Sequence, residues 1–137
     1  MYEKIKVRNY VDVNTNFKAG DIVWACAYTP TSNKEEKYCY CKPIKGRLMP
    51  YNREHLNDKL TDLETNPEKY DIAYFIPFKK NGIGLAYSKA VSMFARCYAN
   101  TKEACDELYK ELITEQIDWH KAEIKKLEAE IANLLWT

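Results

Sequence analysis

The sequence predicts an α+β fold: a twisted antiparallel β-sheet, or a small open barrel, followed by one long amphipathic C-terminal helix or two helices that mediate association. Two observations support this prediction. Segments rich in β-forming residues alternate with turn residues over positions 1–99. Positions 100–135 then lack Pro and Gly, and apolar residues recur there at spacings of three and four. We expect one domain, with a sheet region at 1–99 and a helical region at 100–137.

Four segments of the first half have strand patterns. Lys4–Val13 is rich in β-forming residues and predicts the first strand. Asp21–Thr29 is an almost continuous apolar run, which is typical of a central strand. Glu36–Lys42 contains alternating tyrosines and cysteines and suits a hairpin partner for that strand. Pro43–Met49 predicts a further short strand, in which Gly46 marks a bulge or bend.

The middle of the chain changes character. Positions 50–69 are rich in charged residues and Asn, and they predict a mobile loop that contains a short amphipathic helix. Tyr70–Phe78 returns to a strand pattern. The Asn81-Gly82 dipeptide is the strongest hairpin signal in the chain and predicts a two-residue turn with positive φ. The return strand is expected over Leu85–Tyr98, with successive side chains on opposite faces.

The helical region begins with a capping signal. Asn100 suits the N-cap, and Glu103 suits the third helical position of a capping box. The helix would run about 50 Å, which is longer than a small domain is wide. Its seam consists of six apolar residues and one histidine: Ile113, Ile117, His120, Ile124, Leu127, Ile131 and Leu134. The seam predicts packing along another helix and hence self-association, with His120 as a packed or register-setting polar residue.

Composition and charge narrow the function classes. A net charge of +1 argues against a polyanion-binding surface over the whole molecule, and also against a DNA mimic. The five cysteines, without a secretion signal, favour reduced thiols in a cytoplasm. No apolar run is long enough to span a membrane. Phosphate-loop, dinucleotide, serine-nucleophile and zinc-ligand motifs do not occur, so we expect no catalytic residue, no metal and no cofactor.

One stretch before the helix carries residues suited to binding. Phe94, Arg96 and Tyr98 alternate along the expected return strand, which leads to Asn100 at the helix start. An aromatic plane can stack on a base, an arginine can pair with a phosphate, and a helix N-terminus favours anions. The alternative is structural: Phe94 and Tyr98 pack beneath the helix, with Arg96 at the rim.

Two further arginines lie around the turn at Pro50. Only four of the 21 basic residues are arginines, so Arg47 and Arg53 indicate sites where the bidentate geometry of a guanidinium is needed. We include both among the candidate ligand-binding residues. The alternative is that they belong to a solvated sheet edge.

The stretch Tyr74–Ile113 resembles small uncharacterised proteins of Firmicutes phages. The shared features are a sheet, a helix start of the form Y-A-[ND]-T-x-E-A, here Tyr98–Ala104, and a following L-Y-x-E-L-I, here Leu108–Ile113. The abundance of Lys, Asn, Ile and Tyr also suits an AT-rich genome, such as that of a clostridial bacterium or its phage. The layout of a sheet and long helices is similar to that of the phage Thoeris anti-defence sponge family.

That resemblance implies a function and a set of roles. Members of the family are expected to sequester cyclic ADP-ribose-type signals in pockets at a dimer interface without degrading them. By this resemblance, Phe94 or Tyr98 would contact the adenine, and Asn100 and Arg96 would contact the ribose and phosphate. For these four positions the resemblance implies roles in binding. It does not give a residue-by-residue alignment with the pocket of the family.

Three functions remain open from the sequence. The first is a phage-encoded, non-enzymatic antagonist of bacterial immunity that sequesters a nucleotide-derived signal at a homo-oligomer interface, in the cytoplasm of an infected host. The alternative is a protein-binding inhibitor of a host defence complex, of the anti-CRISPR type. The third is a structural or regulatory module without a ligand. In each case the expected partner is a second copy of the chain, and neither a membrane nor a nucleic acid is expected.

Overall fold

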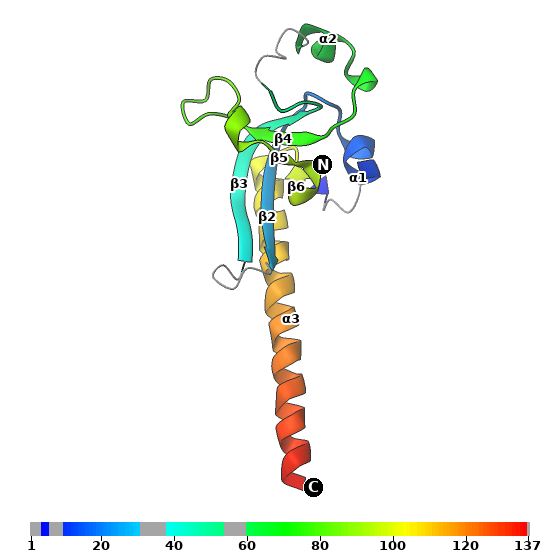
Figure 1. The fold of residues 1–137 in the computed structure, drawn as a ribbon. Helices are drawn as coiled ribbons and strands as arrows, with labels where there is room; N and C mark the ends of the chain where they lie inside the picture. Colours follow the sequence, from blue (N-terminus) through cyan, green and yellow to red (C-terminus); the bar gives the residue numbers. More distant parts are fainter. Residues whose placement is uncertain (1–3, 6–9, 31–37, 54–59, 137) are drawn as a thin grey trace.

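An open antiparallel sheet and one long helix form the structure, a computed structural model that describes residues 4–5, 10–30, 38–53 and 60–136 (Figure 1). Within these residues the sheet has six strands in the order β1-β6-β2-β3-β4-β5, and every neighbouring pair is antiparallel. The strands are β1 (Lys4–Ile5), β2 (Ile22–Pro30), β3 (Tyr38–Met49), β4 (Tyr74–Pro77), β5 (Val91–Ser92) and β6 (Cys97–Ala99). The predicted fold class is confirmed, and the sheet takes its open form, with β1 and β5 at its two edges.

The two long strands β2 and β3 form the centre of the sheet. The apolar run of β2 pairs with β3 on one side and with β6 on the other, as expected for a central strand. The predicted strands 36–42 and 43–49 form one continuous strand, β3, from residue 38 onward, and residues 36 and 37 lie outside the described residues. Its register against β2 shifts between Ala25 and Ala27, whose partners are Ile44 and Cys41. The bulge therefore lies at Lys42 and Pro43, where Pro has no backbone N–H to place in a ladder.

Gly46 has a different role from the predicted bulge. It pairs in regular register with Val23 on one side and Pro77 on the other. A Cβ atom at this position would lie 2.5 Å from the carbonyl oxygen of Ile76 and 2.5 Å from the Phe75 ring. Glycine is needed here because β4 and the ring approach the backbone closely.

The predicted N-terminal strand is wrong over residues 10–13. Within the described residues of this segment, Lys4–Ile5 pairs in the sheet, whereas α1 (Tyr10–Asn16) takes up the end of the expected strand; residues 6–9 lie outside the described residues. Val13 and Phe17 are four residues apart, so a helical turn brings them to one side. Both are buried in the core, and the Phe17 amide donates to the Val13 carbonyl at 2.9 Å. Burial of this pair outweighs the β propensity of the segment.

The hairpin after β4 is wider than predicted. Phe78 pairs with Leu85, so six residues lie between the paired residues instead of two, and within this turn Lys79 N–H donates to the Gly84 carbonyl at 3.0 Å. Positive φ at Gly82 is confirmed, and Gly84 also has positive φ. The Asn81 side chain accepts from the Ile83 amide at 2.9 Å, which gives the turn local support.

The predicted return strand over Leu85–Tyr98 is broken into four pieces. They are η3 (Tyr87–Lys89), β5, η4 (Met93–Ala95) and β6. The Ser92 side chain accepts from the Phe94 amide at 3.4 Å and caps η4. This turn interrupts the period-two alternation on which the predicted strand depends, because residues on either side no longer share one pleated surface.

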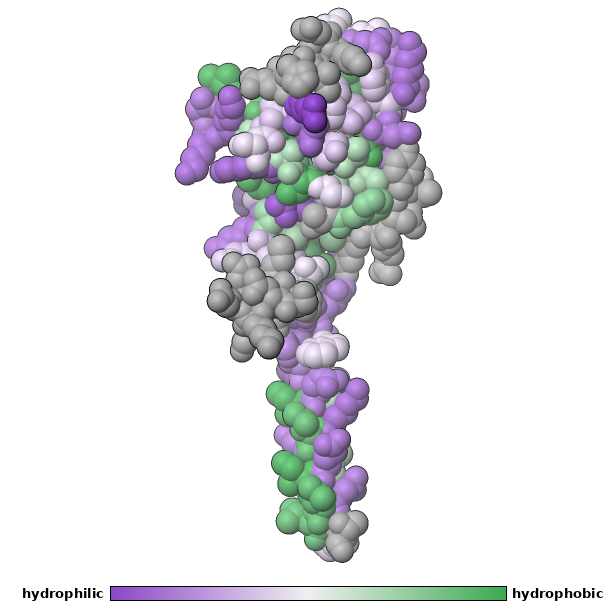
Figure 2. All heavy atoms as spheres, in the orientation of Figure 1, coloured by the Kyte–Doolittle hydropathy of each residue, from purple (hydrophilic) through white to green (hydrophobic). Residues whose placement is uncertain are grey.

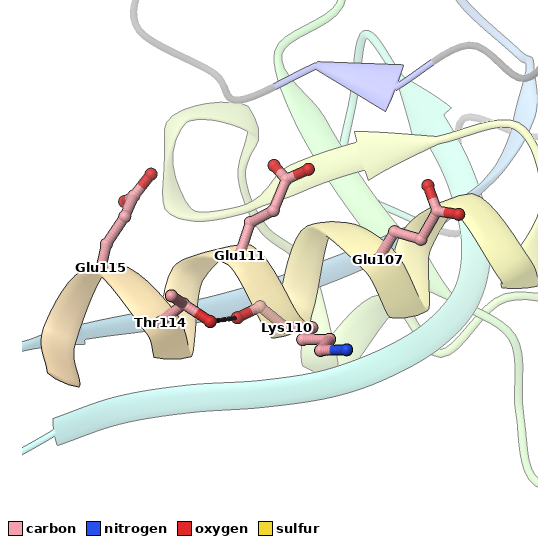
Figure 3. Close-up of a pocket in the computed structure, with 5 residues that line it drawn as sticks. All are labelled: Glu107, Lys110, Glu111, Thr114 and Glu115. Carbon is pink, nitrogen blue, oxygen red and sulfur yellow. Dashed lines mark hydrogen bonds between the residues drawn. The ribbon is translucent and has the colours of Figure 1, made fainter. Parts of the chain in front are cut away.

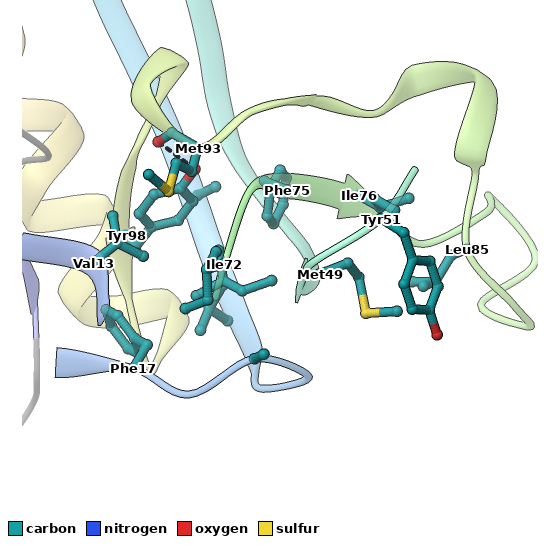
Figure 4. Close-up of a cluster of buried hydrophobic side chains, with 14 of the residues drawn as sticks. Val13, Phe17, Met49, Tyr51, Ile72, Phe75, Ile76, Leu85, Met93 and Tyr98 are labelled. Atoms are coloured by element: carbon teal, nitrogen blue, oxygen red, sulfur yellow. Dashed lines mark hydrogen bonds between the residues drawn. The ribbon is translucent and has the colours of Figure 1, made fainter. Parts of the chain in front are cut away.

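Two apolar clusters cover the two faces of the sheet. The larger one includes Phe75, whose ring centroid lies 5.8 Å from that of Tyr98 (Figure 4). It also takes in Leu63 of α2 (Leu60–Thr65), so the short helix predicted within 50–69 is confirmed. A 3-10 turn, η2 (Pro67–Lys69), follows it. The mobility of 50–69 stays a prediction, and residues 54–59 lie outside the described residues.

The smaller cluster lies where the helix α3 (Lys102–Trp136) meets the sheet. It consists of Cys26, Ala99, Ala104, Cys105, Leu108 and Leu112. The helix cap is one residue later than predicted, because the Thr101 hydroxyl accepts from the Ala104 amide at 3.2 Å. Thr101 is thus the N-cap in place of Asn100, and Glu103 is the second helical residue. The helix runs through 35 residues without a break, so the alternative of two helices is wrong.

Candidate interaction surface

The second half of α3 projects beyond the sheet (Figure 1). The last α3 residue buried against the sheet is Leu112. The space-filling view shows apolar side chains gathered along one side of the projecting part (Figure 2). Its exposed apolar seam members are Ile117, Ile124, Leu127, Ile131 and Leu134, with exposed fractions of 47%, 53%, 60%, 59% and 76%. About half or more of each side chain is therefore in contact with water in a single chain.

Helix geometry explains why the sheet leaves the seam uncovered. The α3 side chains buried by the sheet are Ala104, Cys105, Leu108 and Leu112. Five residues rotate an α-helix by about 140°, so Ile117 points well away from the side on which Leu112 lies. The helix thus has two apolar stripes in different directions. The first holds α3 on the sheet, and the second, the seam, is available to another molecule.

The size of the seam sets the strength of any association. Full burial of Leu or Ile contributes about 1.5–3 kcal/mol, so covering these half-exposed side chains contributes about 1 kcal/mol each. Two copies would cover ten such side chains and gain about 10 kcal/mol, against a cost of association of about 4–15 kcal/mol. The seam alone is thus suited to reversible, concentration-dependent pairing.

The four candidate ligand residues before the helix do not form the predicted face. Phe94 is 53% exposed on η4, and Asn100 is exposed in the turn before α3. Tyr98 points the other way: its side chain is fully buried in the larger cluster, where its hydroxyl donates to the Met93 carbonyl at 2.8 Å (Figure 4). Tyr98 therefore presents no ring face to a ligand, in agreement with the structural alternative for this residue.

Arg96 carries a buried polar atom within the described part of the chain. Its side chain is partly buried. Among the described residues, its Nε atom is buried and has no hydrogen-bond acceptor. A buried guanidinium N–H without an acceptor is costly, so this atom is the strongest polar feature near the start of α3.

The other two candidate arginines lie apart from this set. Arg47 on β3 donates from Nε to the Gly20 carbonyl at 2.9 Å and forms an ion pair with Glu64 at 3.8 Å. It thereby joins the turn before β2 to α2, which is a structural role. Arg53 is exposed in the segment after β3. The structure thus distributes the six predicted ligand residues over three places.

A hollow beside α3 is lined by acidic side chains. Glu107, Glu111 and Glu115 point to the same side of the helix (Figure 3). The Lys4 ammonium lies 3.1 Å from a carboxylate oxygen of Glu107 and 3.1 Å from one of Glu111. These hydrogen bonds raise the pKa of Lys4, first through Glu107 and then through Glu111. Lys4 therefore partly neutralises the acidic side chains of the hollow, and its two ion pairs join β1 to α3.

Three tyrosines that were not predicted as a site form a cluster on the sheet. Tyr28 of β2 packs edge-on against Tyr109 of α3, with ring centroids 6.1 Å apart, and lies 6.5 Å from Tyr40 of β3. Tyr40 is 64% exposed. Tyr28 and Tyr40 are direct partners in the β2–β3 register, and the alternation of Tyr and Cys in β3 was a usable signal for their common face.

The buried thiols offer little nucleophilic chemistry. Cys26 is fully buried, pairs in register with Cys97, and lies with its sulfur 3.8 Å from the Cys105 carbonyl. Interaction with Cys105 and then burial raise the pKa of the Cys26 thiol. A thiol held in its neutral form is a weak nucleophile. No three His, Cys, Asp or Glu side chains gather as a metal site within the described part of the chain.

Comparisons with known proteins identify no relative. No protein-family model, curated protein or solved structure matches the chain. The resemblance to phage counter-defence proteins therefore stays a prediction. None of the helices in the described ranges has the length and apolar character needed to cross a membrane.

Proposed function

We propose that this protein is a self-associating, non-enzymatic binding protein. In this proposal α3 joins copies of the chain through its seam, and the sheet presents the surfaces that bind a target. The observation that carries the proposal is the seam beyond the sheet, where Ile117, Ile124, Leu127, Ile131 and Leu134 are exposed at helical spacing. A scattered exposed Leu needs no explanation, whereas a continuous stripe along a projecting helix favours a partner helix.

Sedimentation analysis tests this proposal directly. The native chain should change from monomer to oligomer as its concentration rises through the micromolar range. Ile124→Asp would place a charge in the seam and should leave a monomer. Ala129→Asp is the matched control, because it adds the same charge to the same exposed helix outside the seam. A native chain that stays monomeric at high concentration would overturn the proposal.

Counter-defence in the cytoplasm of an infected bacterium is the proposed setting, with a cyclic ADP-ribose-type or related nucleotide as the proposed ligand. The sequence resemblance is the basis for the setting and the ligand, and exposed Phe94 and Asn100 together with partly exposed Arg96 support them. Stacking and phosphate pairing from such groups would suit a nucleotide. Calorimetry with cyclic nucleotides should detect binding that Phe94→Ala with Arg96→Gln abolishes. Binding that survives the double variant would exclude these residues.

The tyrosine cluster favours a second candidate, a protein-binding inhibitor. Tyrosine is enriched at protein interfaces, since it offers a large rigid ring with a polar end. Tyr40 is exposed beside Tyr28 and Tyr109, so a partner could cover all three rings. In this candidate, Tyr40→Ala should abolish inhibition of the host complex and leave the fold intact. Under the nucleotide proposal, the same variant should keep full ligand binding.

A further inference from the structure

The exposed seam has a regular heptad pattern. Its residues alternate between spacings of three and four, which defines the a and d positions of a coiled coil. Every a position from 117 onward is isoleucine: Ile117, Ile124 and Ile131. The d positions are His120, Leu127 and Leu134. The strict seven-residue repeat also matches the left-handed supercoil of two paired helices.

We infer that the projecting half of α3 pairs in parallel and in register with the same segment of a second copy. This inference rests on the proposed self-association and specifies its geometry. β-Branched residues at a with leucine at d favour two parallel strands, whereas isoleucine at both positions favours larger assemblies. In such a pair, each isoleucine meets its own counterpart, and His120 meets His120 of the partner subunit.

Charges beside the seam distinguish this arrangement from its alternatives. Glu123 occupies a g position and Glu128 the following e position. In a parallel, in-register pair, Glu123 faces Glu128 of the partner subunit, and the two carboxylates repel each other. In antiparallel pairs, e positions face e positions instead, so Glu128 would face Lys121, Thr114 or Glu128 of the partner subunit, depending on the register. Replacing Glu128 by Lys should therefore strengthen a parallel pair. In an antiparallel pair the same change should weaken the association or leave it unchanged.

The parallel arrangement also determines what the assembly presents. The sheet lies at the N-terminal end of α3 (Figure 1). In a parallel pair the two sheets would therefore come together at one end of a common rod. Two identical target surfaces would then lie side by side, and a multivalent target could bind both at once. An antiparallel pair would instead separate the sheets by the length of the paired segment.

Cysteine crosslinking tests the orientation. Leu134→Cys should form a reducible dimer under mild oxidation, because the two 134 positions face each other only in a parallel, in-register pair. Ala129→Cys lies outside the seam and is the matched control, and the native chain reports any crosslinking through its own cysteines. A native chain that sediments as a dimer while Leu134→Cys fails to crosslink would overturn the inference and leave the proposed self-association intact. A native monomer would instead overturn the proposed function.

Charge exchange gives a second, independent measurement. Glu128→Lys should tighten dimerisation about fivefold to tenfold, because two repulsive pairs become attractive. Adding Glu123→Lys should reverse that gain, since the facing groups then both carry positive charge. Weaker or unchanged dimerisation in Glu128→Lys would contradict the parallel arrangement.

Discussion

The Tyr98 hydroxyl donates a 2.8 Å hydrogen bond to the backbone carbonyl of Met93, inside the larger core cluster. This bond links β6 to η4 across five residues and satisfies two polar groups that the fold buries. It also decides which way the ring points. Tyr98, which the sequence predicted as a stacking residue for a ligand, instead stabilises the turn before α3 (Figure 4).

Replacing Tyr98 by Phe should lower the free energy of unfolding by about 1–2 kcal/mol at neutral pH, because the Met93 carbonyl loses its donor. The pH dependence should change as well. Burial raises the pKa of Tyr98 above its ordinary value. The contribution of the neutral hydroxyl is complete below about pH 10, the pKa of an unfolded tyrosine, and it is lost as the pH rises from there towards the raised pKa.

Urea unfolding at neutral and alkaline pH measures both effects. The native chain should lose more stability than Tyr98→Phe between these conditions, so the two should converge as the pH rises. Equal losses in the two proteins would contradict a buried, neutral Tyr98.

Gly46→Ala should be strongly destabilising, by about 1–3 kcal/mol or more, because the added methyl group overpacks the core. Its Cβ would meet the Ile76 carbonyl oxygen and the Phe75 ring, each at 2.5 Å. Gly82→Ala is a control of a different kind: φ is +76° there, and the added Cβ meets nothing within 4 Å. That change should cost only the left-handed strain, about 1–2 kcal/mol. Thermal unfolding of both variants compares steric overlap with strain.

Thr101→Ala should destabilise the start of α3 by about 1 kcal/mol, since the Ala104 amide loses its side-chain acceptor. Thr101→Ser keeps the hydroxyl and should retain most of the stability. Circular dichroism during urea unfolding checks the order of the three proteins. If Thr101→Ala and Thr101→Ser unfolded together, the hydroxyl would not be the cap.

His120→Leu should tighten self-association by about tenfold, because a polar residue at a core position of a coiled coil lowers stability. The residue is exposed in the single chain, so the variant should change the dimer more than the monomer fold. Sedimentation equilibrium gives the dissociation constant of each protein. His120→Asp should act in the opposite direction, and weaker association of the leucine variant would remove His120 from the dimer interface.

Elements governed by local signals were predictable from the sequence. The continuous apolar run placed β2 at the centre of the sheet, and positive φ at Gly82 follows from turn chemistry. The long α3 was predictable because its period, and the absence of Pro and Gly, extend over many turns. Its exposed seam could be read in the same way, since residues three and four apart must share a side of any helix.

The segment around η4 could not be predicted in this way. Phe94, Arg96 and Tyr98 alternate in the sequence, but a capped 3-10 turn at Met93 changes their directions. The same limit applies to Val13, whose β-branched side chain is buried from a helix. In both places long-range packing outweighs a weak local preference.

The sequence by itself determined the order of sheet and helix, the apolar seam and the lack of recognisable catalytic motifs, because each depends on spacing along the chain. Only the tertiary structure decided which residues are accessible. Tyr98 and Arg47 form hydrogen bonds that stabilise the fold. Tyr28, Tyr40 and Tyr109 lie side by side although they come from three elements. The physical reason is that accessibility depends on which distant side chains cover a residue, and its near neighbours in the sequence do not specify them.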